Sequence, residues 1–161
     1  MKYLLLYCTF LSPVLAFAQK ETTTSDMVYN VYRKDVQAII KYNKEYLGTL
    51  KNKSDIIHSN DSVYTTVKLL FNKNCIDKVA LFVDIVTEAK ENRTRISFNN
   101  PRYEYEGDKC PKEGTLEELV NCDKCKMGTS LILEEYKDYR KDIFIMYHRF
   151  LKDKRHDKDN W

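Results

Sequence analysis

The chain has 161 residues, with 27 basic and 24 acidic side chains and a formal net charge of +3. This near balance, without an arginine-rich block or a basic stripe between aromatic residues, gives no support for nucleic-acid binding. Hydrophobic residues make up 43% of the chain, while glycine and proline number only four and three. The composition therefore favours a folded, helix-rich domain over a disordered chain or a turn-rich β-sandwich.

The N-terminus has the pattern of a secretory signal peptide. Lys2 precedes an apolar run over residues 3–15, and the small-x-small sequence Ala16-Phe17-Ala18 follows it. The run is too short to cross a bilayer, so we expect cleavage after Ala18 and no membrane anchor. The sequence thus predicts a signal peptide at 1–18, a single domain at 19–153 and a charged tail at 154–161. The expected location is secreted or periplasmic.

Cysteine usage fits an oxidising compartment. Cys8 would leave with the signal peptide, and the four remaining cysteines are candidates for disulfides, with three pairings open. Zinc would need a second ligand pair, which the chain lacks, and haem attachment normally needs a histidine where Lys126 stands. We therefore expect no metal and no cofactor. The disulfide candidates are Cys75, Cys110, Cys122 and Cys125.

Apolar residues recur at helical spacing in the first half of the chain. From Val28 to Leu50 they follow three- and four-residue steps after Ser25-Asp26, which predicts an amphipathic helix that Gly48 ends early. A polar linker is expected at 51–60. A second apolar stripe runs from Val63 to Val86 without glycine or proline, and it predicts one long helix or two.

The second half contains an irregular segment and a clear helix. Residues 94–106 surround the turn signal 99–101, so a small β-hairpin is the alternative to an irregular loop. Thr115 is expected to cap a short helix at 115–120, and the apolar stripe from Ile132 to Phe150 predicts a long C-terminal helix. The predicted fold is mainly all-α: a bundle of about four helices with a disulfide-bonded irregular segment.

Three resemblances follow from these patterns. Four cysteines ending in Cys-x-x-Cys resemble insect chemosensory proteins, which would imply bonds from Cys75 to Cys110 and from Cys122 to Cys125, and an apolar ligand tunnel. A Cys-x-x-Cys before the last helix also resembles short-chain helical cytokines, which would imply a bond from Cys75 to Cys122 or Cys125. The export signal is similar to those of many exported proteins of Bacteroidota. The pieces that match the chemosensory family are NCIDK at 74–78, CPKEG at 110–114 and CDKC at 122–125.

No catalytic motif is found, so we expect a secreted, non-enzymatic binding protein. One hypothesis is a carrier of small apolar ligands; the alternative is a cytokine-like signalling protein or an inhibitor or immunity-type protein that binds a protein partner. In the alternative, Tyr103 and Tyr105 would contact the partner. An interior cavity of several hundred cubic ångström would favour the carrier. The residues expected to line it are Tyr32, Val67, Val83, Tyr136 and Tyr139.

Overall fold

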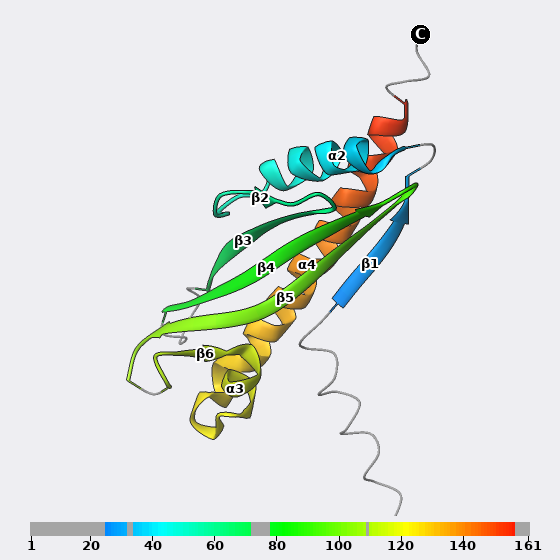
Figure 1. Cartoon of the computed structure of the whole chain (residues 1–161). Coiled ribbons are helices and arrows are strands. Elements are labelled where there is room, and N and C mark those ends of the chain that lie inside the picture. The colour runs from blue at the N-terminus through cyan, green and yellow to red at the C-terminus, as the bar shows by residue number, and fades with distance from the viewer. Residues whose placement is uncertain (1–24, 32–33, 72–77, 109, 157–161) are drawn as a thin grey trace, which may run out of the picture.

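The protein forms an antiparallel β-sheet with helices packed on one face, as the computed structural model in Figure 1 shows. The structure describes residues 25–31, 34–71, 78–108 and 110–156; the predicted signal peptide, Tyr32 and Cys75 lie outside them. The sheet has the order β1-β5-β4-β3-β2, and β6 pairs with β5 beyond the end of β1. The strands are β1 (Ser25–Asn30), β2 (Ile57–His58), β3 (Ser62–Phe71), β4 (Lys78–Lys90), β5 (Arg93–Glu106) and β6 (Glu113–Thr115). The helices are α2 (Val36–Gly48), α3 (Leu116–Asn121), the 3-10 turn η2 (Asp123–Cys125) and α4 (Lys126–His156).

The all-α prediction is wrong, because Ser62–Phe71, Lys78–Lys90 and Arg93–Glu106 are long strands and not helices. Val63 and Val67 are four residues apart, which suits a helix, but they also belong to a set that alternates with period two. In β3 and β4, every second side chain is buried against the helices. Nine of the 23 residues of these strands are β-branched, a residue type that suits the pleated surface of a sheet.

The predicted hairpin at 94–106 is also wrong, because β5 runs through the expected turn. Asn100 and Pro101 lie at a bulge, where the pairing with β4 shifts between Phe82 and Asp84. Asn100 has a positive φ of 48°, and proline is tolerated at a bulge because its missing N–H leaves no gap in the ladder there. The actual hairpin turn follows β4, where Asn92 has a φ of 59°.

The N-terminal helix prediction is correct only for its second half. Residues 25–30 form β1, which pairs with the start of β5. Helix α2 begins after Asp35, whose carboxylate caps the helix by accepting a hydrogen bond from the N–H of Ala38 at 2.7 Å. It ends at Gly48, as predicted. Helices α3 and α4 are confirmed, and Thr115 caps α3 with Glu118 completing a capping box.

The core lies between one face of the sheet and helices α2 and α4. Phe98 of β5 packs edge-on against Phe144 of α4, with ring centroids 5.3 Å apart. A buried polar cluster joins three elements: Asn43 of α2 donates to Thr94 of β5 at 3.2 Å and accepts a hydrogen bond from the hydroxyl of Tyr147 in α4. All three side chains are buried, so this cluster fixes both helices relative to the sheet. None of the described helices is long and apolar enough to cross a membrane.

Candidate functional site

A groove of about 670 Å³ lies between β1, at the edge of the sheet, and the outer side of α4. We call it the β1–α4 groove. Its apolar part comes from Met27 and Tyr29 of β1 and from Phe144 and Ile145 of α4. Met27 and Ile145 are 43% and 40% exposed, although both are large apolar side chains. The volume lies within the range of ligand-binding pockets, which makes the groove a candidate binding site.

Local structure explains why these side chains converge. In β1, Met27 and Tyr29 are two residues apart and so lie on the same face of the sheet. In α4, Lys141, Ile145 and His148 are spaced four and three residues apart and so share one side of the helix. The Tyr29 hydroxyl donates a 2.9 Å hydrogen bond to the carbonyl oxygen of Phe144. This bond holds the strand against the helix.

The rim of the groove is basic. Lys137, Arg140, Lys141 and Arg149 line it with a single carboxylate, that of Asp138. Within the described part of the chain, none of these four cations forms an ion pair. The Arg140 guanidinium lies over the Tyr136 ring, 4.7 Å from its centroid. An anionic ligand with apolar groups would therefore meet both complementary charge and apolar surface in this groove.

Arg140 is the least satisfied of these cations. Its Nε and Nη1 atoms are buried and have no hydrogen-bond partner among the described residues. Buried donors without partners are costly, and this cost is greater when the donor carries charge.

Burial raises the pKa of Tyr29 from 10.0 to about 12, and that of Tyr136 to about 12 as well. The unfolded chain therefore releases these protons at lower pH than the folded protein does, so stability falls as pH rises above the unfolded value. We expect the free energy of unfolding to be constant up to pH 10.0 with respect to these groups and to decrease between pH 10.0 and about 12. Urea unfolding at stepped pH, with phenolate absorbance recorded in parallel, checks this. Phenolate absorbance that the folded wild type shows at pH 10.0 and the double variant Tyr29→Phe, Tyr136→Phe lacks would contradict it.

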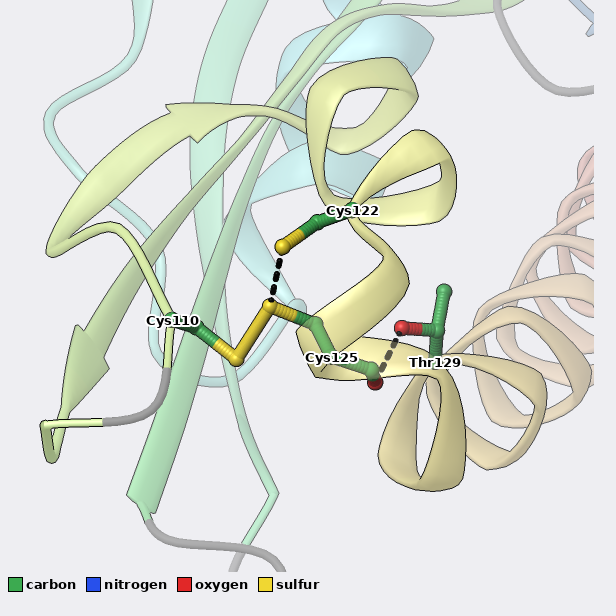
Figure 2. The surroundings of a disulfide bond; sticks show 4 residues. All are labelled: Cys110, Cys122, Cys125 and Thr129. Atoms are coloured by element: carbon green, nitrogen blue, oxygen red, sulfur yellow. Dashed lines mark hydrogen bonds between the residues drawn. A yellow bond between two sulfur atoms is a disulfide. The ribbon is translucent and has the colours of Figure 1, made fainter.

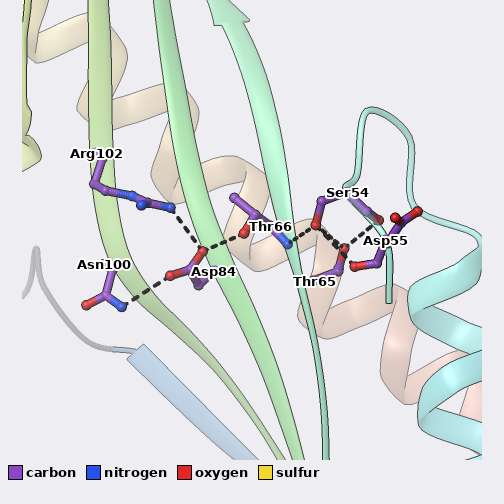
Figure 3. Close-up of polar contacts among 7 residues, drawn as sticks. All are labelled: Ser54, Asp55, Thr65, Thr66, Asp84, Asn100 and Arg102. Carbon is purple, nitrogen blue, oxygen red and sulfur yellow. Dashed lines mark hydrogen bonds and ion pairs between the residues drawn. The ribbon is translucent and has the colours of Figure 1, made fainter. Parts of the chain in front are cut away.

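No helix of the described chain covers the other face of the sheet, and Figure 3 shows polar contacts around Asp84 of β4. Asp84 accepts hydrogen bonds from Thr66 at 2.7 Å, Asn100 at 3.1 Å and Arg102 at 3.3 Å. The Asp84 carboxylate is therefore already hydrogen-bonded to side chains of the neighbouring strands. Arg95 likewise contacts Glu88 and, at 3.6 Å, Asp26. Opposite charges are therefore paired on this face at Arg102 with Asp84 and at Arg95 with Glu88.

Three cysteines, Cys110, Cys122 and Cys125, lie together beside α3 and the start of α4, as Figure 2 shows. Cys110, after β5, is bonded to Cys125, and Cys122 is not bonded to any described cysteine, with its Sγ 2.8 Å from that of Cys125. This pairing differs from those that the family resemblances implied, in which Cys110 pairs with Cys75 and Cys125 pairs with Cys122 or Cys75. The fourth candidate, Cys75, lies outside the described residues. The described residues contain no cluster of three or more groups that could hold a metal ion.

The side chains expected to line a ligand cavity lie in the packed core. Val67, Val83 and Tyr136 are 1%, 0% and 2% exposed, and Tyr139 is half-buried against Phe98. None of the four lines the β1–α4 groove. Tyr103 and Tyr105, expected to contact a partner, are also buried, since they point to the helix-covered face of β5.

Sequence reasoning missed the groove because it treated residues 28–50 as one helix. The signal in α4 was visible: Lys137, Lys141 and Ile145 follow one another at four-residue steps and mark a side of the helix with both charge and exposed apolar surface. The signal for β1 was weaker, because only six residues form the strand.

The arrangement defines a class of α/β proteins in which helices cover one face of an antiparallel sheet. Two solved structures share it: a TBP-like protein from Parabacteroides distasonis and a DUF4468 family protein from Bacteroides ovatus. The first has a TM-score of 0.60 and 16% identity over 80% of this chain and 92% of its own. The second has a TM-score of 0.60 and 11% identity, covering 80% of this chain and 85% of its own.

At these identities the likeness concerns the fold. It overturns the resemblances to insect chemosensory proteins and helical cytokines, both of which are helical proteins. No protein-family model matches the chain, and no curated protein matches it significantly in sequence.

Proposed function

We propose that this is an exported, non-enzymatic binding protein that holds an acidic, partly apolar segment of a protein partner in the β1–α4 groove. The observation that carries the proposal is the combination of exposed apolar side chains with four basic residues that lack ion pairs within the described chain. Exposed large apolar groups beside unpaired charge are typical of interaction sites. The filled core at Val67 and Val83 argues against a carrier with an interior cavity.

Export is part of the proposal. The signal-peptide pattern at 1–18 supports it, as does the bond between Cys110 and Cys125, because disulfides persist in oxidising compartments. A small amphipathic anion is the second candidate ligand, since the groove volume suits one.

Site-specific photo-crosslinking tests the proposed site. A photoreactive residue at Ile145, in the groove, is expected to capture a discrete protein in the producing cells, whereas the same residue at Leu70 is not. Leu70 is a matched control because it is 67% exposed but lies on the uncovered face of the sheet.

Reversing the charge of a groove lysine tests whether the partner is bound through its acidic groups. Lys141→Glu is expected to lower the crosslinking of the partner at Ile145 about tenfold, because the substitution places like charge against an acidic segment. Lys152→Glu is the control, since Lys152 is exposed on the same helix but outside the groove. Equal loss in both variants, or equal capture at Leu70, would contradict the proposed site; capture of no protein together with saturable binding of an anionic detergent would favour the small ligand.

A further inference from the structure

The two edges of the sheet differ in how their backbone groups are satisfied. At the β3 edge, β2 pairs with β3. The segment before β2 also forms backbone hydrogen bonds with β3. The Ser54 N–H donates to the carbonyl of Thr66 at 2.8 Å, and the Lys68 N–H donates to the carbonyl of Asn52 at 2.9 Å. At the other edge, no strand of the described chain pairs with the outer side of β1. One edge is therefore closed and the other is open.

The register shows which groups β1 presents at this open edge. The Val31 N–H donates to the carbonyl of Asn92 at 2.8 Å, so Val31 directs its backbone groups toward β5. In an antiparallel pair this direction alternates from residue to residue. Met27 and Tyr29 therefore bond to β5, while the N–H and C=O groups of Asp26, Val28 and Asn30 point outward. These are three donors and three acceptors, and no strand of the described chain pairs with them.

The open edge and the β1–α4 groove are adjacent, because the groove begins at Met27 and Tyr29. A strand added to β1 would direct alternate side chains into the groove and the others toward the uncovered face. Exposed edge strands otherwise promote unwanted pairing, and proteins usually cover or blunt them. Here the edge lies beside apolar surface and unpaired basic groups, which is the arrangement of domains that bind peptides by strand addition.

We propose that the partner segment binds as an extended strand that pairs with the outer edge of β1 and places apolar and acidic side chains in the groove. This inference rests on the proposed function and specifies its binding mode. Charge complementarity favours an acidic segment as the ligand. Four basic groups and one carboxylate line the groove, so a basic or neutral segment would bind more weakly.

The experiment uses the full chain and a defined probe. The probe is a fluorescent, N-acetylated decapeptide with threonine at every second position and leucine and glutamate alternating at the others. Leucine and glutamate then share one face, which fixes which side enters the groove. Two further versions are N-methylated, one on the threonines and one on the leucines and glutamates. Each version removes the N–H groups from one edge of the strand only.

Strand addition predicts that one N-methylated peptide loses at least about tenfold in affinity while the other retains it, since only one edge bonds to β1. A version with lysine in place of glutamate is expected to lose binding. Equal affinities for both N-methylated peptides would overturn strand addition, and groove binding itself would stand if Lys141→Glu still weakened the parent peptide. Absence of all binding, with groove crosslinks also absent, would overturn both.

A change in the protein gives an independent test. Val28→Pro removes an outward N–H without touching the ladder to β5, and it is expected to weaken the parent peptide about tenfold. Val28→Thr keeps the N–H and serves as the matched control. Circular dichroism verifies the fold of each variant, and the N-methylated peptides decide the question if Val28→Pro does not fold. Sedimentation showing that wild type is a dimer, and Val28→Pro a monomer, would assign the edge to a second copy and overturn the proposal.

Discussion

Replacing Asn43 by alanine is expected to lower the free energy of unfolding by about 3 kcal/mol, because it removes the hydrogen bonds that the buried Asn43 amide makes to two hydroxyl groups and creates a cavity. The Asn43 amide donates to Thr94 at 3.2 Å and accepts from Tyr147, and the hydroxyl oxygens of Thr94 and Tyr147 are 3.0 Å apart. All three side chains are at most 1% exposed. Urea unfolding followed by circular dichroism measures the loss.

The matched control is Gln37→Ala, which changes an exposed residue of the same helix and should alter stability by less than about 0.5 kcal/mol. A double-mutant cycle with Thr94→Val isolates the coupling between α2 and β5. We expect clear non-additivity, because the two side chains share one hydrogen-bond cluster. Additive effects would show that the cluster does not connect the helix to the sheet.

Removing the bond between Cys110 and Cys125 is expected to cost about 3 kcal/mol, the chain-entropy value for a closed loop of this size. The bond spans 15 residues and ties the segment after β5 to the start of α4. The double variant Cys110→Ala, Cys125→Ala tests it by urea unfolding. Part of the loss will come from the buried Cys125 side chain, which is 6% exposed.

Cys122→Ala is the control for the disulfide, because this thiol is not bonded among the described residues. It should leave stability nearly unchanged, and a non-reducing peptide map should still join Cys110 to Cys125. If Cys122→Ala removed as much stability as the double variant, the pairing would be different in solution. The same map on wild-type protein shows whether Cys122 is alkylated as a free thiol.

Some elements could be predicted from the sequence because their signals are local. The stripe from Ile132 to Phe150 indicated α4, and Thr115 with Glu118 indicated the start of α3. These signals depend on side chains within a turn or two of each other, so no knowledge of the partner elements is needed. The stripe did not predict every buried residue of α4 correctly, because Met146 is exposed and Tyr147 lies in the core in its place.

The strands could not be recognised in this way. Tyr64 and Leu70 lie on the uncovered face yet are large and apolar, so they blur the alternation that identifies a half-buried strand. The buried Thr65 and Thr87 blur the alternation as well, because threonine counts as polar in such a pattern. Spacing alone therefore suited a helix from Val63 to Val86 as well as two strands.

The sequence by itself determined the helices α3 and α4, the end of α2 at Gly48, and the charge and apolar side chains that α4 carries. Only the tertiary structure decided that β1 lies beside α4 and so forms a groove, and that β1 has an open edge. The physical reason is that strand pairing joins residues far apart in the chain, as Tyr29 and Thr94 are. Their pairing is selected by burial of the whole sheet face, which no local pattern records.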